Sequence, residues 1–338
     1  MKRVLCIVLA SIMALTLLAA CADNGGDAPS EGFTIGISWQ GPNNDWAINM
    51  QAHLNMALAE HSGRIDQVIF REHGWEDAQQ IANIEDLMLM DIDLLITFPH
   101  SDTGLVGVLD RVSDAGIPAV IFGATPGTDQ YTALVKADTV AIGRAEGAWM
   151  VDRLGGQGNV LVILGAPGTS YAVDVLQGYS EAMANYPGMN IIGIEYAFWS
   201  PVSAKEIMES YIARGDQIDG VIVSGLMGLG VLEAFVDAGL PVPPLTAGDG
   251  WTGFLRRAEE IGFSDFAALP LNDFIAATEA VNLAIRILDG ETVPKDTFIP
   301  PNPMMPAGQM LGMLTDDMPP AYWIGGIVPM NQFNDFID

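Results

Sequence analysis

The sequence is poor in the residues on which many enzymes and nucleic-acid-binding proteins depend. Cysteine occurs only at positions 6 and 21, so the chain beyond residue 21 has neither a disulfide nor a cysteine nucleophile. Lysine and arginine number 14 against 42 acidic residues, which gives a formal charge of −28. A field of that sign repels phosphate groups and anionic lipid headgroups. We therefore expect no nucleic-acid partner and no binding to an anionic membrane surface.

Histidine is also scarce, and its distribution argues against catalysis. The four histidines, His53, His61, His73 and His100, all lie in the first third of the chain. No nucleophile elbow, HExxH or CxxC motif is present, so neither a catalytic triad nor a metal site is predicted. The glycine-rich run 165–170 lacks the Gly-Lys-Ser/Thr of a phosphate-binding loop. We predict a protein that is not an enzyme and that has no cofactor and no metal.

The first 20 residues have the pattern of an export signal. Lys2 and Arg3 precede an apolar run over residues 4–18, and Cys21 directly follows Leu-Ala-Ala. This arrangement resembles the bacterial lipobox, in which the cysteine is acylated, although an ordinary signal peptide with an incidental cysteine is the alternative. Residues 21–32, rich in glycine and aspartate, predict a flexible tether. We expect a body anchored by lipid outside the cytoplasmic membrane, in the periplasm or at the cell surface.

From Phe33 onward, short aliphatic runs alternate with amphipathic stretches, and half of the whole chain is apolar. This alternation predicts parallel sheets with right-handed crossovers, arranged as two doubly wound α/β lobes. The strands are predicted at 33–38, 65–71, 93–98, 119–122, 131–135, 159–164, 190–197, 219–223, 243–247 and 265–269. The helices are predicted at 45–61, 76–90, 104–115, 139–154, 171–186, 203–214, 228–238, 252–261 and 272–289.

The last part of the chain, residues 293–338, is rich in proline, methionine and aromatic residues. Such proline density is typical of a mobile tail. However, Tyr322, Trp323, Phe333 and Phe336 carry too much apolar surface to remain in water. We therefore expect this tail to pack back along both lobes.

Several short motifs, in their order and spacing, resemble those of the type I periplasmic sugar-binding proteins, relatives of the ribose- and galactose-binding proteins. The likeness covers roughly residues 33–290. The motifs are Gly-Pro-Asn-Asn-Asp-Trp at 41–46, Asn-Ile-Glu-Asp-Leu at 83–87, Phe-Pro-His-Ser-Asp at 98–102, Gly-Thr-Ser at 168–170, Gly-Asp-Gly at 248–250 and Leu-Asp-Gly at 288–290.

The resemblance implies two similar lobes joined by a three-strand hinge, with the ligand in the cleft between them. It divides the chain into an N-terminal lobe of residues 33–136 plus about 271–296, and a C-terminal lobe of residues 137–270 plus the tail from about 297 to 338. It also implies an extracytoplasmic receptor that delivers its ligand to the permease of an ABC importer.

Candidate binding residues lie in the loops that follow the predicted strands, because ligands of open parallel sheets bind beyond the carboxyl ends of the strands. Sugars need directional partners for their hydroxyl groups and aromatic rings for their C–H faces. The residues of these types are Trp39, Gln40, Asn43, Asn44, Trp46, Asp102, Ser170, Tyr171, Asp174, Trp199, Ser224, Asp249 and Trp251. Asp249 is the strongest candidate, because its Gly-Asp-Gly setting resembles the binding aspartate of the family.

Each candidate also has a purely structural interpretation. Asp45 and Asp102 could cap helices, and Asn43 and Asn44 could serve turn geometry. Tryptophans at loop ends often pack the lobes together. His100, beside a proline, is predicted to be a loop or supporting residue and not a ligand contact.

The sequence also departs from the sugar-binding pattern. Phe-Gly-Ala at 122–124 replaces the aspartate usual after the fourth strand, and Val-Asp-Val at 173–175 replaces an arginine. Ser-Gly-Leu-Met at 224–227 stands where an Asn-Asp pair is common. These departures favour a deoxy sugar, a polyol or a less polar solute over an ordinary ribose or galactose.

The sequence therefore predicts a monomeric solute-binding lipoprotein that closes on a sugar or a sugar-like molecule. A sensory receptor that presents its closed form to a chemoreceptor or a histidine kinase is the alternative. An exported glycoside-acting enzyme is a third possibility, and it would need two carboxylates across the cleft.

Overall fold

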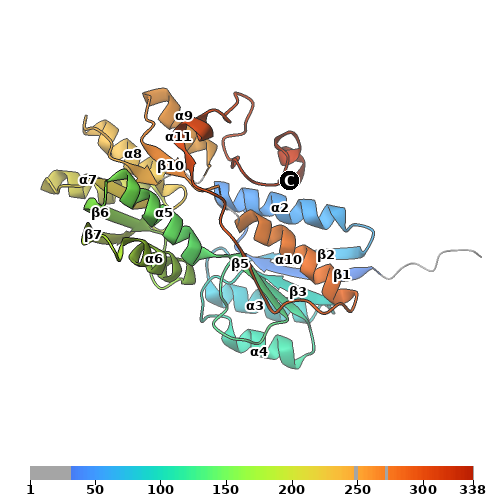
Figure 1. Cartoon of the computed structure of the whole chain (residues 1–338). Helices are drawn as coiled ribbons and strands as arrows, with labels where there is room; N and C mark the ends of the chain where they lie inside the picture. Colours follow the sequence, from blue (N-terminus) through green and yellow to red (C-terminus); the bar gives the residue numbers. More distant parts are fainter. Residues whose placement is uncertain (1–31, 247–249, 271–272, 338) are drawn as a thin grey trace, which may run out of the picture. The chain divides into compact units, whose positions relative to one another are not determined.

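The computed structural model describes residues 32–246, 250–270 and 273–337. From Phe33 they form two lobes, each built around one six-stranded sheet (Figure 1). Cys21 and Asp249 lie outside the described residues.

The first lobe, called the N-lobe, has a sheet in the order β11-β5-β4-β3-β1-β2, in which every pair is parallel. The strands β3 and β4 are buried along their whole length, as expected of inner strands with helices on both faces. The elements are β1 (Phe33–Trp39), α2 (Asp45–Glu60), β2 (Ile65–Glu72), α3 (Asp77–Met88), β3 (Leu94–Thr97), α4 (Val106–Asp114), β4 (Ala119–Phe122), β5 (Ala133–Ala137), α10 (Asp273–Leu288) and β11 (Asp296–Ile299).

The second lobe, called the C-lobe, has a sheet in the order β12-β10-β9-β8-β6-β7, parallel except for the β10–β12 pair. Its elements are α5 (Thr139–Arg153), β6 (Gln157–Leu164), α6 (Ser170–Met183), β7 (Gly188–Tyr196), α7 (Pro201–Arg214), β8 (Gly220–Val223), α8 (Met227–Asp237), β9 (Leu245–Thr246), α9 (Thr252–Ile261), β10 (Phe266–Ala268), β12 (Met305–Pro306), α11 (Ala307–Leu311) and a 3-10 helix, η1 (Met330–Phe336).

The chain passes between the two sheets three times: after β5, between β10 and α10, and after β11. The third passage follows Ile299, slightly beyond the expected position near residue 296, because residues 296–299 pair with β5 and extend the N-lobe sheet. All three passages lie toward the β11–β5 edge of one sheet and the β12–β10 edge of the other. The strands β2 and β7 are therefore the edge strands farthest from this hinge.

The tail packs against both lobes, as predicted. On the C-lobe side, the hydroxyl of Thr252 at the start of α9 donates to the carbonyls of Pro319 and Pro320 at 2.9 and 2.7 Å. On the N-lobe side, His53 Nε2 on α2 accepts from the backbone N–H groups of Ile327 and Val328 at 3.0 and 3.3 Å. The short strands β11 and β12 and the helices α11 and η1 were not predicted.

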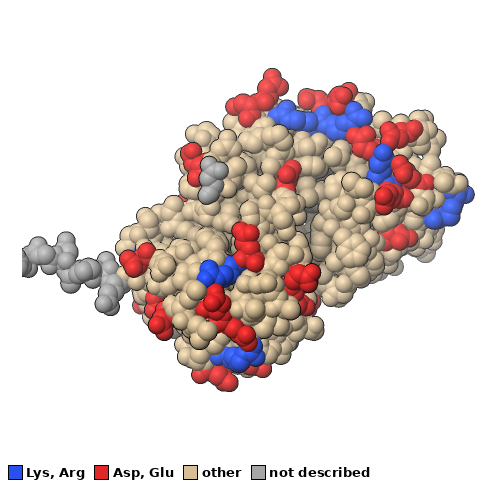
Figure 2. All heavy atoms as spheres, turned by 180° about the vertical axis from the view of Figure 1, so that it is seen from behind, with Lys and Arg blue, Asp and Glu red and all other residues tan. Residues whose placement is uncertain are grey.

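Most Lys and Arg side chains lie next to acidic ones, and on the face shown in Figure 2 further acidic side chains lie away from any basic group. The exposed ion pairs include Arg71–Asp86 at 2.8 Å and Arg153–Asp265 at 2.6 Å. The whole chain has 14 basic and 42 acidic residues, and most of the described basic groups are paired. The charges left without a partner on the surface are therefore mainly acidic. Among the described residues, no helix is both long and apolar enough to span a membrane.

Candidate functional site

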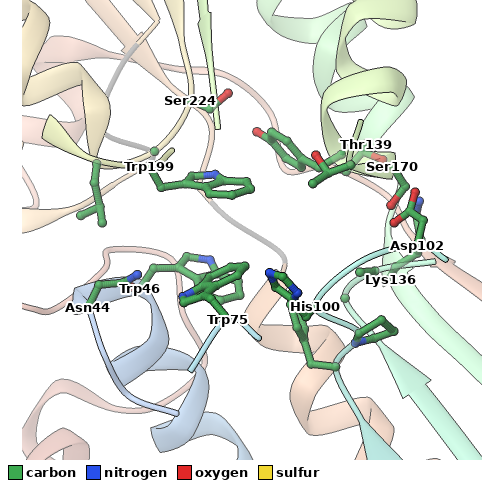
Figure 3. Close-up of a pocket in the computed structure, with 18 of the residues that line it drawn as sticks. Asn44, Trp46, Trp75, His100, Asp102, Lys136, Thr139, Ser170, Trp199 and Ser224 are labelled. Atoms are coloured by element: carbon green, nitrogen blue, oxygen red, sulfur yellow. The ribbon is translucent and has the colours of Figure 1, made fainter. Parts of the chain in front are cut away.

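A cavity that is partly open to solvent lies between the lobes at the carboxyl ends of their strands (Figure 3). Both lobes and the tail contribute to its walls. The lining residues are Asn44, Trp46, Trp75, Phe98, Pro99, His100, Asp102, Gly123, Ala124, Lys136, Thr139, Thr169, Ser170, Tyr171, Trp199, Ser224, Gly225, Leu226 and Trp323.

One side of the cavity is aromatic. Trp75 of the N-lobe and Trp199 of the C-lobe stack on each other, with ring centroids 5.7 Å apart and planes 20° apart. Trp46 packs edge-on against Phe98 at 5.8 Å, and Trp323 from the tail closes the wall. Figure 3 shows the indoles of Trp46 and Trp75 on one side and that of Trp199 facing them. Such rings cover the C–H faces of a sugar or a polyol well.

The opposite side is polar and lies near the hinge. Lys136 on β5 is 5% exposed, and its ammonium donates to Asp174 Oδ2 on α6 at 2.8 Å. The hydroxyl of Thr139 donates to the same carboxylate oxygen at 2.6 Å. The Lys136–Asp174 bond joins the two lobes, whereas Thr139 and Asp174 both belong to the C-lobe. The ion pair uses part of the positive charge of Lys136 before any solute arrives.

Asp102 follows β3 on the N-lobe and meets the start of α6 on the C-lobe. The hydroxyl and the backbone N–H of Ser170 both donate to its carboxylate. Burial raises the pKa of Asp102, and the Ser170 bonds and the charge of Lys136 oppose that rise. The carboxylate accepts the two Ser170 bonds at the cavity wall.

Ser224, after β8, is 2% exposed, and its hydroxyl has no hydrogen-bond partner within the described part of the chain. A buried hydroxyl without a partner costs free energy, so such groups are uncommon in native proteins. Because Ser224 also lines the cavity, its hydroxyl is available for a solute.

His100 was predicted to be a loop or supporting residue and not a ligand contact. It lies in the loop after β3, as a supporting residue would, but it also lines the cavity. Its Nδ1 lies 2.8 Å from Asp77 Oδ1, and its ring contacts the indole of Trp75 edge-on at 5.5 Å. The neighbouring His73 has its pKa lowered to about 4, first by burial and then by the charge of His100. His73 is therefore neutral at pH 7.

The structure brings seven of the predicted residues to the cavity wall. They are Asn44, Trp46, Asp102, Ser170, Tyr171, Trp199 and Ser224. Asn44 also caps α2, accepting from the N–H of Ala47 at 2.9 Å, so its structural and binding interpretations hold together. Asp102 does not cap α4, which begins only at Val106, but its carboxylate accepts the backbone N–H of Ser170 at the start of α6.

Three predicted residues are placed elsewhere. Trp39 is fully buried in the core and does not reach the cavity, because β1 is an inner strand covered on both faces. Gln40 and Asn43 line a separate, shallower groove beside Glu72, since the chain turns at Gly41 with a φ of 87°.

Two further candidates lie behind the wall. Asp174 accepts the bonds of Lys136 and Thr139 described above, and it is not itself among the lining residues. Trp251 stacks on Trp323 at 6.0 Å and donates from Nε1 to Asp45 Oδ2 at 2.9 Å, another bond between the lobes. Burial raises the pKa of Asp45, and the bond from Trp251 opposes the rise.

The sequence prediction missed Trp75, Lys136, Thr139 and Trp323. Trp75 follows the edge strand β2, and the loop after that strand was not among the loops predicted to reach the cleft. Lys136 lies within a strand and Trp323 within the tail, so neither follows the rule of strand-end loops. The sequence offered one signal for Lys136, namely a lysine within an otherwise apolar strand. Among residues 32–246, 250–270 and 273–337, no cluster of three His, Cys, Asp or Glu side chains is suited to a metal ion.

Comparison with known proteins gives one matching family model, described as "Periplasmic binding protein domain", over residues 35–292. Among curated relatives, the xylitol-binding protein of Mycolicibacterium smegmatis is 29% identical over 220 residues, which cover 64% of this chain and 62% of that protein. The chain thus spans less than two thirds of that relative's length. The galactofuranose-binding protein of Escherichia coli is 26% identical over 216 residues, covering 62% of this chain and 67% of that protein.

Solved structures share the fold. A solute-binding protein of an ABC transporter from Bacillus halodurans, with bound myo-inositol, aligns with a TM-score of 0.75 and 22% identity over 84% of this chain and 97% of that one. A Mycobacterium smegmatis protein in complex with β-D-fucofuranose aligns with a TM-score of 0.76 and 24% identity over 84% and 95%. Both structures have the two-lobed fold described above.

Proposed function

The chain belongs to the periplasmic binding protein domain family, and on that premise we propose that its cleft captures a neutral sugar or a sugar-like polyol for an ABC importer. The observation that carries the proposal is the cavity itself. Its walls come from both lobes, with indole rings on one side and hydrogen-bonding groups on the other. A solute that touches both lobes favours the closed arrangement by its differential contacts.

The charges of the cavity support a neutral solute. Its ammonium, on Lys136, is already bonded to Asp174, so an anion would find no free counter-charge there. The formal charge of −28 also repels anions at long range. Asp102 instead offers an acceptor, the Ser170 hydroxyl can accept while it donates to Asp102, and the Ser224 hydroxyl can donate or accept. Xylitol and galactofuranose, named for two relatives, are neutral polyhydroxyl compounds.

A binding role is better supported than a hydrolytic one. Glycoside hydrolysis needs two carboxyl groups that face each other across the bond. Among the described lining residues, Asp102 is the single carboxylic acid. The relatives from Mycolicibacterium smegmatis and Escherichia coli are likewise named as binding proteins. Asp249 remains a proposed contact, on its family resemblance alone.

A thermal-shift panel of pentoses, hexoses, pentitols and inositols tests the proposal. A solute at 100 times its Kd stabilises the folded state by about 2.7 kcal/mol, which raises the melting temperature by several degrees. We expect at least one neutral polyol or sugar to give this shift, and Asp102→Ala to reduce it. Asp110→Ala, an exposed acidic position on α4, is the matched control. A panel in which only charged solutes raise the melting temperature would contradict the proposal.

We also propose that Cys21 carries the lipid anchor and that the body works outside the cytoplasmic membrane. Cys21→Ser should move the full-length protein from the membrane fraction to the soluble fraction. Retention of the variant in the membrane pellet would count against the anchor. A strain that lacks the protein separates transport from sensing. If the protein serves an importer, this strain should no longer take up the solute identified by the thermal-shift panel. If the protein is purely a sensory receptor, uptake should stay intact.

A further inference from the structure

The stacked pair Trp75–Trp199 lies at the end of the cavity farthest from the hinge, which we call the mouth. Trp75 follows β2 and Trp199 follows β7, and these are the edge strands farthest from the three chain passages of the hinge. A rotation about the hinge moves this end of the cleft the most. The pair is therefore the closing contact between the lobes at the mouth of the cavity.

The two indoles touch each other and leave no room for a solute between them. Their centroids are 5.7 Å apart, with planes 20° apart. A ring sandwiched between two others needs two stacking distances, about 7–8 Å in total. The pair therefore forms a lid over the solute position and not the two halves of a sandwich.

The backbone holds both rings in this position. Four described non-glycine residues have a left-handed φ, and three of them are Trp75 (70°), Phe198 (51°) and Trp199 (54°). Bulky residues adopt this region only where the surrounding structure imposes it, and such positions concentrate at functional sites.

Neighbouring residues seat each indole. The Trp199 ring lies against Gly165, where an added Cβ would come within 2.1 Å of the ring. On the other lobe, the Trp75 ring packs edge-on on His100 at 5.5 Å, and His100 is fixed by Asp77 at 2.8 Å. Each lobe thus presents a pre-positioned half of the lid.

We infer that the Trp75–Trp199 lid is a size filter, which admits single-unit sugars and polyols and rejects solutes extended by a second sugar. This inference rests on the proposed function. Four of the cavity's hydrogen-bonding groups, on Asp102, Lys136, Thr139 and Ser170, lie together on one side of the two indoles, as Figure 3 shows. A second sugar unit bound there would project into the space of the indoles, so the lid could not close.

Circular dichroism tests the lid contact without any solute. Two indoles this close give an exciton couplet in the far-ultraviolet indole band. Trp75→Phe and Trp199→Phe should each remove the same couplet, and the double variant should remove no more. Gly165→Ala should remove it with both tryptophans present. Trp149→Phe, a tryptophan on α5 outside the cavity lining, is the control, and the Trp251–Trp323 couplet should persist in all variants.

Binding measurements with xylitol, D-xylose and D-galactose, and with the two-unit sugars xylobiose and lactose, test the filter. We expect the wild type to prefer the one-unit probe by about tenfold or more, and Trp75→Ala and Trp199→Ala to lose most of that preference. Equal affinity of the wild type for one-unit and two-unit probes would overturn the filter. So would loss of the couplet when a one-unit probe binds, because the probe would then lie between the rings. If no probe binds while the Trp75–Trp199 couplet is present, the solute proposal fails and the lid contact stands. If Trp75→Phe and Trp199→Phe remove no shared couplet from the wild-type spectrum, the lid itself is overturned.

Discussion

The hinge side and the mouth of the cavity hold the two lobes together by different means. Near the hinge, the lobes are joined by charge-assisted bonds, such as Lys136–Asp174 at 2.8 Å. At the mouth, they meet through the stacked rings of Trp75 and Trp199. Separating a buried ion pair leaves a charge without a partner, whereas separating two indoles exposes only apolar surface. The molecule is therefore built to open at the mouth while its polar contacts near the hinge stay made.

The largest loss of stability should come from breaking the hinge-side ion pair between Lys136 and Asp174. Lys136→Met leaves Asp174 without its main partner, and the side chains of this pair are only 7% and 25% exposed. We expect the free energy of unfolding to fall by roughly 2–4 kcal/mol in chemical denaturation. The double variant Lys136→Met/Asp174→Leu should recover most of the loss.

A surface lysine supplies the control for this prediction. Lys205 pairs with Asp237, and the side chains are 33% and 57% exposed. Lys205→Met should cost less than about 1 kcal/mol. Similar losses for the two lysine variants would show that the buried pair contributes nothing special to joining the lobes.

The next largest effect on stability should come from His53, which contacts the tail, and it should depend on pH. Burial lowers the pKa of His53 from 6.5 to about 4, and its Nε2 accepts from two N–H groups of the tail. The unfolded chain therefore binds a proton at higher pH than the folded one. His53 should reduce stability as the pH falls from about 6.5 to about 4, by up to about 3 kcal/mol in total.

Comparison with His53→Gln isolates this contribution from that of the many carboxylates. The variant should be less stable at pH 7, but its unfolding free energy should fall less steeply between pH 6.5 and pH 4.5. Parallel pH profiles for the two proteins would remove His53 from the account.

The Trp75–Trp199 contact at the mouth should contribute less to the free energy of unfolding than the ion pair near the hinge. In a double-mutant cycle of Trp75→Ala and Trp199→Ala, we expect a coupling energy of about 0.5–1.5 kcal/mol, typical of an aromatic pair. A coupling energy as large as that of the hinge-side pair would contradict the view that the cleft opens at its mouth.

The smallest effect should come from Ser224, which belongs to neither set of contacts between the lobes. Ser224→Ala removes a buried hydroxyl that has no partner in the described part of the chain. In solute-free protein, the unfolding free energy should stay unchanged or rise by up to about 1 kcal/mol. A loss above that size would mean that the hydroxyl has a structural role.

The alternation of apolar runs and amphipathic stretches was enough to predict the main helices and strands. It could not reveal β11 or β12, because segments of 4 and 2 residues carry no period and depend on partners far along the chain. The rule of strand-end loops found Asp102, Ser170 and Ser224. It did not find Trp323, because the path of the tail depends on contacts that form only in the folded protein. Trp39 shows the opposite error, in which an indole at a strand end packs into the core.

The central claim is that one uncharged solute is held by both lobes at once. Titration calorimetry of the best solute from the panel with Asp102→Ala, on the N-lobe, and Ser224→Ala, on the C-lobe, tests it most directly. We predict that each variant weakens binding about tenfold or more. Full affinity in either variant would show that the solute contacts only one lobe through these groups, and would contradict the account.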